Sequence, residues 1–356
     1  MKKILKVEKK PLVSSECWTY YKFSVMQTVS NFYEWLSCHM KIYIDQNGNS
    51  VFGENGYMYP LSYFSDILNI HDGNIMSKSK KDIVDYLIEQ IDNGVYVIVD
   101  LNYRRINGKN DNTFWLHETL IYGYDKGTKE FLTPLLSDGS FKESRISFDK
   151  LEDAFDDAIK YYSEDKNRLF NRRTWFFGIT CIKPNRNYRN ANAYFDFISK
   201  LKSELDGSIY KKYKSVDGIE TENGYSYAMG LSCLSYLAAY IKKIIIENHC
   251  TPENIRKCRK SCTKIYENQS IIKSTLEWFI NTQEYSNTIL ESLLFEYQRC
   301  CDIMLLNVRR FYKYHQNQDG ILLEKIINDL NHLYMQERLL LERLIEEFKM
   351  VYKSKL

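Results

Sequence analysis

The hydrophobic pattern changes near Pro184, and this change constrains the fold more than any other feature of the sequence. Before this point, short apolar runs of strand length alternate with stretches whose apolar residues recur every three or four positions. After it, helical periodicity continues to Leu356 and strand signals are almost absent. We therefore expect an α+β domain over residues 1–185, followed by an α-helical domain over residues 186–356.

The first half contains signals for both helices and strands. Apolar residues at helical spacing predict helices over 18–36, 79–94 and 147–162. Alternating or continuous apolar runs predict strands over 95–103, 117–125, 130–136 and 174–184. The stretch KGTK joins the second and third of these strands, which predicts a β-hairpin.

The second half contains two strongly apolar segments that we interpret as core helices. Residues 321–352 carry a stripe of leucine and isoleucine at near-heptad spacing, which favours packing inside the domain over a dimeric coiled coil. Residues 225–246 are apolar but too short to span a membrane once their polar residues are counted. We expect this segment to be a buried helix.

Charge and composition narrow the class of protein. The chain has 49 basic and 46 acidic residues, so its charge does not require a nucleic-acid partner. The basic start lacks an apolar stretch long enough for a signal peptide, and no run would span a membrane. We expect a cytoplasmic protein whose nine cysteines are mostly reduced thiols.

Cys17 is the first candidate for a catalytic residue. It stands where the helix predicted over 18–36 begins, and Ser14 and Ser15 just before it are candidate N-caps. The positive end of a helix lowers the pKa of a thiol, which favours the nucleophilic thiolate. A cysteine nucleophile also needs a base, and His117, at the start of a predicted strand, is the best candidate.

Each of these residues also has a plainer interpretation. A cysteine at a helix start more often serves packing alone, because free cysteine is among the most buried residue types.

The stretch 249–262 holds one histidine and three cysteines but has no paired C-x-x-C, and it has helical periodicity. We interpret its thiols as ordinary core and surface groups, and we expect no metal and no cofactor.

Four stretches in order carry a resemblance to a known family. They are ECWTYYKFSVMQTVSNF, LIEQIDNGVYVIVDLNYRR, LHETLIYGYDKGTKEFL and ISFDKLEDAF, within residues 11–160. The chain resembles the acyltransferase family typified by the butirosin biosynthesis enzyme, and its layout is similar to the leader peptidases of bacteriocin exporters and to the closthioamide amide synthetase. The resemblance implies a papain-like fold in the first domain, with Cys17 as nucleophile and His117 as base.

The third member of the expected catalytic triad does not match the family. The aspartate that follows the histidine strand in related proteins falls on Thr133 or Leu135 here, and neither is a carboxylate. We expect the Thr133 hydroxyl, or the Asp138 carboxylate from the following loop, to accept a hydrogen bond from the His117 ring.

The resemblance also implies a reaction and partners. We expect transfer of an acyl group from a phosphopantetheine thioester on an acyl or peptidyl carrier protein to an amine, forming an amide through an acyl-cysteine intermediate. This reaction would belong to natural-product assembly of the nonribosomal peptide kind, without nucleic-acid or membrane partners. Two alternatives remain: a papain-like peptidase, disfavoured because its expected glutamine falls on Pro11, and a non-catalytic binding protein with a relict cleft.

Overall fold

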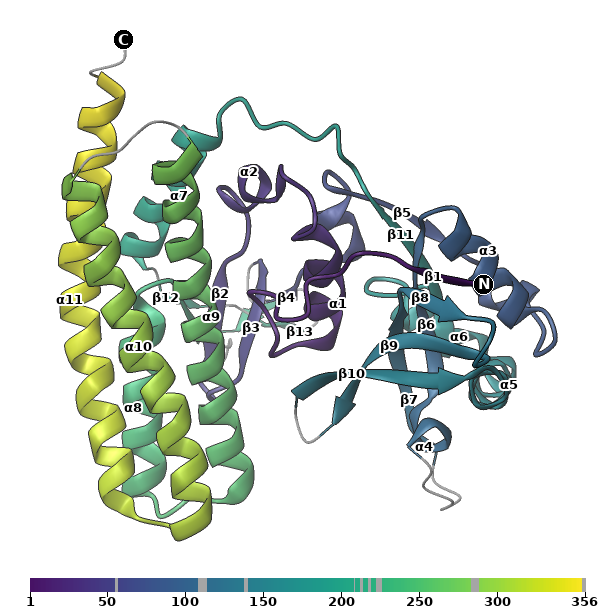
Figure 1. Cartoon of the computed structure of the whole chain (residues 1–356). Coiled ribbons are helices and arrows are strands. Elements are labelled where there is room, and N and C mark those ends of the chain that lie inside the picture. The colour runs from purple at the N-terminus through teal and green to yellow at the C-terminus, as the bar shows by residue number, and fades with distance from the viewer. Residues whose placement is uncertain are drawn as a thin grey trace. The chain divides into compact units, whose positions relative to one another are not determined.

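The computed structural model describes residues 1–54, 57–107, 114–137, 140–207, 209–211, 214–216, 219–221, 226–282 and 288–353. The chain divides into two compact units, each made of two stretches of sequence (Figure 1). The first unit comprises Met1–Phe32 and Tyr59–Tyr188, and the second comprises Tyr33–Met58 and Arg189–Leu356. Both units contain helices and antiparallel strands, so the fold class is α+β.

Two antiparallel four-stranded sheets form the frame of the first unit. One has the order β1-β8-β9-β10, with strands Lys2–Ile4, Gly123–Asp125, Glu130–Ser137 and Ser140–Ser147. The other has the order β5-β11-β6-β7, with strands Leu68–Asp72, Ile179–Pro184, Tyr96–Asn102 and Leu116–Ile121. Tyr122 alone separates β7 from β8, so the chain passes directly from one sheet into the other.

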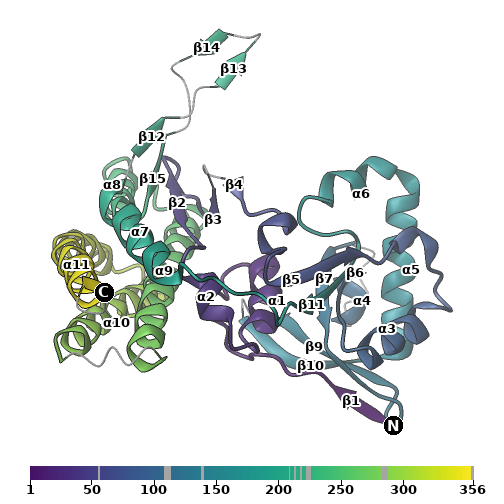
Figure 2. The same ribbon diagram turned by 90° about the horizontal axis from the view of Figure 1, so that it is seen from above.

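Helices cover both faces of the second of these sheets. The helices of the first unit are α1 (Cys17–Met26), α3 (Ile83–Asp92), α4 (Tyr103–Ile106), α5 (Phe148–Glu164) and α6 (Lys166–Arg172), with 3-10 turns at Leu61–Phe64 and Ile75–Ser77. Helix α1 contacts β7 and β11, whereas α3 and α5 contact β6 from the other side (Figure 2). The sheet therefore carries α1 on one face and a helical layer on the other.

Strand β6 lies at the centre of this unit, between β11 and β7. All seven of its residues are buried. Val97 and Val99 belong to the same apolar core as Leu87 of α3 and Phe155 of α5, which explains why the strand is almost continuously apolar. Asp100 and Asn102 are the polar exceptions, and a carboxylate at the depth of Asp100 requires polar partners.

The second unit combines an antiparallel sheet with long helices. The sheet has the order β12-β15-β2-β3-β4, with strands Ile209–Lys211, Ser226–Met229, Ile42–Asp45, Ser50–Glu54 and Tyr57–Met58. A separate hairpin pairs β13 (Lys214–Val216) with β14 (Ile219–Thr221). The expectation that strands are almost absent after Pro184 is therefore wrong. Strand β15 pairs with β2, a partner more than 180 residues away that local pattern does not reveal.

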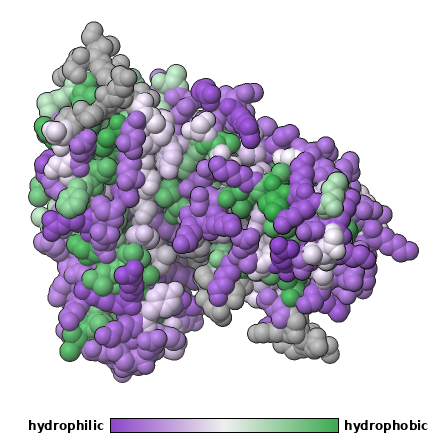
Figure 3. Space-filling view, in the orientation of Figure 1, coloured by the Kyte–Doolittle hydropathy of each residue, from purple (hydrophilic) through white to green (hydrophobic). Residues whose placement is uncertain are grey.

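The helices of this unit are long and pack side by side in Figure 1. They are α7 (Ala193–Asp206), α8 (Ser232–Ile246), α9 (Pro252–Thr282), α10 (Thr288–Asn317) and α11 (Gly320–Lys353). The leucine stripe of α11 is buried inside the unit, as the sequence predicted, at Leu323, Ile326, Leu330, Leu333, Leu340 and Leu344. Exposed apolar side chains remain among polar ones over α10 and α11 (Figure 3).

Two further differences from the sequence prediction concern boundaries. The helix expected over 18–36 is two helices, α1 and the short α2 (Phe32–Leu36), because backbone turns at Thr28 and Val29 interrupt it. The segment 33–58, which we expected in the first domain, belongs to the second unit because β2 pairs with β15 there and carries β3 and β4 beside it in the same sheet. Within the described part of the chain, no helix has the length and apolar character needed to cross a membrane.

Candidate active site

Cys17 is the first residue of α1, and its side chain is partly exposed. Glu16 occupies the N-cap position with extended backbone, and its carbonyl accepts the first helical hydrogen bond from the Tyr20 N–H at 2.8 Å. The cap is therefore Glu16, and not Ser14 or Ser15 as the sequence suggested. The thiol nevertheless lies at the helix start, where the prediction placed it.

The fold brings Cys17 and His117 together from positions 100 residues apart. Helix α1 packs against β7, and β7 carries His117 opposite Leu101 of β6. One donor atom each from Cys17, His117 and Glu118 lie within 4.8 Å of one another. The structure thus brings together the two residues that the sequence singled out, and it adds a third that sequence reasoning missed.

Glu118 is the direct partner of the thiol. Its side chain is buried, and its Oε1 accepts a hydrogen bond from Cys17 Sγ at 2.6 Å. Burial acts to raise the pKa of Glu118, but the His117 ring, the Arg172 guanidinium and the thiol hydrogen bond together hold it below its ordinary value. The carboxylate is therefore ionised at neutral pH.

A chain of charged and polar groups continues from Glu118 into the core. Arg172, the last residue of α6, donates from Nη2 to Glu118 Oε2 at 3.1 Å and to Asp100 Oδ1 at 3.0 Å. The Tyr162 hydroxyl of α5 donates to Asp100 Oδ2 at 2.5 Å. Burial raises the pKa of Asp100, while the Arg172 charge opposes this shift. Arg172 therefore serves two buried carboxylates on adjacent strands.

The electrostatic setting of Cys17 differs from the expected one. Burial raises the pKa of the Cys17 thiol strongly, and the negative charge of Glu118 raises it further. The backbone of the helix start and the Lys22 ammonium act in the opposite direction but do not compensate. The predicted lowering of this pKa is thus wrong for the free site, because one helix terminus does not outweigh burial beside a carboxylate.

The hydrogen bonds of His117 define its tautomer. Its Nδ1 lies 2.7 Å from the backbone carbonyl oxygen of Glu118, which also accepts from the Tyr21 hydroxyl at 2.8 Å. A carbonyl can only accept, so Nδ1 carries a hydrogen. In the neutral ring Nε2 is then unprotonated and is the atom left to accept a proton.

This carbonyl takes the role that the sequence assigned to Thr133 or Asp138. The Thr133 hydroxyl is buried and has no hydrogen-bond partner among the described residues. Gly123 pairs with Leu132, so Thr133 lies near Tyr122, five residues or about 16 Å of extended chain from His117. The expected bond between Thr133 and the ring is therefore not present, and Asp138 lies outside the described residues.

Lys22 supplies a buried positive charge to the same region, one helical turn beyond Trp18. Its Nζ donates to the Trp18 carbonyl at 2.6 Å and lies 5.1 and 4.7 Å from the ring centres of Phe64 and Phe176. Burial lowers the pKa of Lys22 to about 8, while the nearby Glu118 charge opposes this shift. Lys22 can therefore contribute positive charge beside Cys17 near neutral pH.

Aromatic side chains surround the His117 ring. The ring centres of Tyr103 and Trp115 lie 4.9 and 5.5 Å from that of His117. Tyr103 is fully buried, whereas Trp115 is 41% exposed and its neighbour Phe114 is 40% exposed. Trp115 thus offers an apolar surface next to the candidate base.

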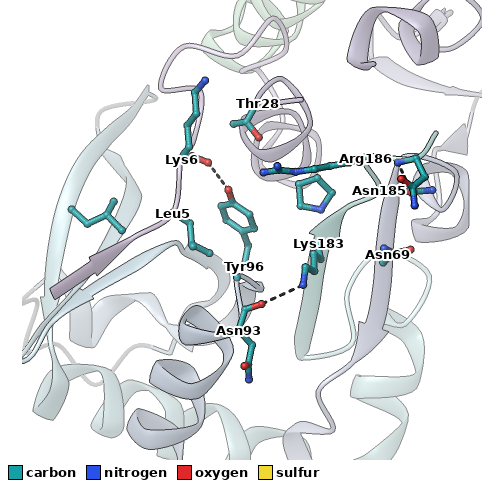
Figure 4. Close-up of a pocket in the computed structure, with 13 residues that line it drawn as sticks. Leu5, Lys6, Thr28, Asn69, Asn93, Tyr96, Lys183, Asn185 and Arg186 are labelled. Carbon is teal, nitrogen blue, oxygen red and sulfur yellow. Dashed lines mark hydrogen bonds between the residues drawn. The ribbon is translucent and has the colours of Figure 1, made fainter. Parts of the chain in front are cut away.

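A cavity of the same unit lies apart from Cys17, His117 and Glu118 (Figure 4). Its volume is about 510 Å³, and its lining includes the basic side chains of Lys6, Lys183 and Arg186. Lys183 donates to the Asn93 carbonyl at 3.3 Å, and the Tyr96 hydroxyl donates to the Lys6 carbonyl at 2.5 Å. None of the three clustered residues lines it, so the cavity is separate from the candidate active site.

Comparison of the chain with models of known protein families found no match, and comparison with curated proteins found none either. The papain-like fold and the acyltransferase family therefore stay predictions from the sequence. The geometry defines a thiol, an imidazole and an ionised carboxylate in one partly exposed cluster at a helix start.

Proposed function

We propose that the chain is a thiol-dependent acyltransferase that forms an amide from a carrier-protein thioester and an amine in natural-product biosynthesis. The observation that carries this proposal is the meeting of Cys17 with His117, whose Nδ1–H is engaged and whose Nε2 is available as a base. The order of the sequence motifs in the papain-like acyltransferases supports it. Such an enzyme would act in the cytoplasm.

In the first step, the Cys17 sulfur attacks the carbonyl carbon of the thioester. His117 Nε2 takes the thiol proton as the new carbon–sulfur bond forms. The bond to the pantetheine sulfur then breaks, and the imidazolium returns the proton to this leaving thiolate. The products of this half-reaction are the acyl-Cys17 enzyme and the free carrier thiol.

In the second step, the amine nitrogen attacks the acyl-Cys17 carbonyl. His117 accepts a proton from the attacking nitrogen, the carbon–sulfur bond breaks, and the Cys17 sulfur takes the proton back. The amide leaves and the resting thiol forms again. The exposed face of Trp115 beside the ring is suited to contact an apolar part of the acyl group.

The resting thiol is protonated and donates to Glu118. Ionised Glu118 is a poor acceptor for this proton because its own pKa is held low. The proton therefore goes to His117, whose charged form Glu118 then stabilises through the short distance between them. Glu118 is a positioning and electrostatic residue in this mechanism.

The test uses a carrier protein loaded with an acyl-phosphopantetheine thioester and a panel of primary amines, with amide and free acid measured by mass spectrometry. The wild-type chain should give amide in excess over acid. Cys17→Ala should abolish turnover, and His117→Gln should slow it by about 10²–10⁴-fold, the usual range for loss of a general base. Cys250→Ala, a partly exposed thiol of the other unit, is the matched control and should keep the wild-type rate.

Two outcomes would contradict amide formation by this chain. Release of free acid at the same rate with and without amine would indicate hydrolysis, as in a peptidase of the same layout. No turnover of any thioester by a folded wild-type chain would favour a binding protein with a relict cleft. The strongly raised pKa of the Cys17 thiol gives this second alternative its physical basis.

A further inference from the structure

Cys17, His117 and Glu118 offer three different kinds of metal-binding atom at one place. Among the described residues, these three form a cluster of potential metal ligands: one donor atom from each lies within 4.8 Å of the others. Tetrahedral zinc is bound at about 2.3 Å by sulfur and about 2.0–2.2 Å by nitrogen or oxygen. Tetrahedral ligands at those lengths lie about 3.3–3.6 Å apart, so Cys17 Sγ and Glu118 Oε1, at 2.6 Å in this structure, would move apart by about 1 Å to admit the ion.

The contacts behind these side chains are those that orient metal ligands. A ligating histidine usually donates its other ring N–H to a carbonyl or carboxylate, and His117 Nδ1 donates to the Glu118 carbonyl. A ligating carboxylate is usually held by a hydrogen bond to its second oxygen, and Arg172 holds Glu118 Oε2. His117 Nε2 and Glu118 Oε1 therefore remain for a shared ligand.

Charge also favours a divalent cation here. A metal-bound Cys17 sulfur and the buried Glu118 carboxylate would together carry two negative charges, which a dication neutralises. Without a metal the thiol keeps its proton and donates it to Glu118 at 2.6 Å. Metal binding would replace this shared proton with the ion and release the proton to solvent.

We propose that Cys17 Sγ, His117 Nε2 and Glu118 Oε1 bind one Zn²⁺ ion and leave its fourth position open. A thiolate and an imidazole select zinc over magnesium or calcium, which prefer oxygen ligands alone. The proposed zinc site depends only on the geometry of these three side chains. If the proposed function is correct, zinc bound to the nucleophile would inhibit acyl transfer reversibly, and this consequence rests on the proposed function.

The test measures metal binding without reference to activity. The full chain is freed of metal by a chelator, the chelator is removed, and Zn²⁺ is titrated against a chromophoric competitor. Wild-type chain should bind one tight equivalent. Affinity should fall in Cys17→Ala, His117→Gln and Glu118→Gln, and by about 10–100-fold in Arg172→Gln, the usual loss for a residue that orients a ligand. Affinity should also rise with pH, because binding releases the thiol proton.

Cys38→Ala is the matched control, since Cys38 Sγ lies 3.0 Å from His39 Nδ1 and forms a second thiol–imidazole pair in the other unit. This variant should keep the tight equivalent. Cobalt in place of zinc should give a thiolate charge-transfer band that is absent in Cys17→Ala and in Cys17→Ser. Circular dichroism should show that each variant is folded.

Two results would overturn the proposed zinc site. They are equal zinc affinity in wild type and a folded Cys17→Ser chain, or loss of the tight equivalent in Cys38→Ala alone. Because absorption reports binding directly, a chain that binds zinc at Cys17 but forms no amide would contradict only the proposed function. A chain that forms amide and binds no zinc would contradict only the metal site.

Discussion

Individual residues of the site were predictable to different degrees. Cys17 and His117 could be identified because a cysteine at a helix start and a histidine at a strand start occur in a recognisable order. Glu118 could not, because side chains alternate along a strand and a neighbour of His117 is expected on the opposite face. The backbone carbonyl that orients His117 leaves no signal in a sequence, so the pattern points instead to side chains, Thr133 or Asp138, for that role.

Thr133→Val tests this correction directly. The Thr133 hydroxyl is buried without a partner among the described residues, so its removal should not slow acyl transfer. The variant should be as stable as wild type, or more stable by up to about 1 kcal/mol, because an unsatisfied polar group is lost. Rates of amide formation and urea unfolding measure the two effects.

Thr180→Val is the control for this substitution. Thr180 is equally buried, but its hydroxyl accepts a hydrogen bond from the Phe177 N–H at 2.9 Å. Its loss leaves this N–H without that partner and should cost about 1–3 kcal/mol. If Thr133→Val instead slowed amide formation tenfold without changing stability, the result would indicate that Thr133 takes part in catalysis.

At the scale of elements, local pattern predicted β6, α3 and α5 well. The single strand expected over 117–125 is instead two strands of different sheets, β7 and β8, divided at Tyr122. The β2–β3 hairpin was missed although Asn47–Gly48 is a strong turn signal and Gly48 has a φ of +72°. The short helix α6 has little apolar periodicity, so nothing in the sequence indicated that its end brings Arg172 to two buried carboxylates.

Arg172→Gln should show how much the bonds from α6 to the neighbouring strands β6 and β7 stabilise the first unit. The substitution leaves Glu118 and Asp100 buried without their shared cation, which should cost about 2–4 kcal/mol, reduced from the fully buried case because Arg172 is partly exposed. Urea unfolding measures the loss. Arg173→Gln, which breaks an exposed pair with Asp72, should cost at most about 1 kcal/mol. Equal losses of unfolding free energy in Arg172→Gln and Arg173→Gln would show that the buried network of Arg172 does not stabilise the unit more than an exposed ion pair does.

At the scale of the whole molecule, the sequence predicted two units of different character but not their make-up. The periodicity change near Pro184 lies close to the observed division between Tyr188 and Arg189. Residues 33–58 belong to the second unit because β2 pairs with the distant strand β15. A local sequence pattern does not reveal which distant strands pair. The same unit buries several charged side chains that no local rule identifies.

Glu337 makes the stability of the second unit depend on pH. Burial, followed by the nearby Glu204, raises the pKa of Glu337 from 4.5 to about 8. Below about pH 4.5 the carboxyl is neutral whether the chain is folded or unfolded, so it contributes no penalty. Between pH 4.5 and 8 only the unfolded chain gains from ionisation, so stability falls as the pH rises.

Glu337→Gln should therefore match wild type in stability at pH 4.5 and exceed it at pH 7.5, because glutamine cannot ionise and still accepts from Gln269. Thermal unfolding should show the higher midpoint, by about 2–4 °C for each kcal/mol gained. Glu342→Gln, on an exposed pair of the same helix, should show no such trend with pH. A Glu337→Gln chain less stable than wild type at pH 7.5 would contradict a buried neutral carboxyl.

The most direct test of the central claim is the mass of the acyl-enzyme. The chain is mixed with acyl-loaded carrier protein without amine, quenched in acid and measured intact, then digested to locate the added group. We predict one acyl group, on Cys17, in wild type and in Cys250→Ala, none in Cys17→Ala, and its loss when an amine is added. An acyl group on another cysteine, or amide formed with no acyl-Cys17 at any time, would contradict the claim that Cys17 is the nucleophile.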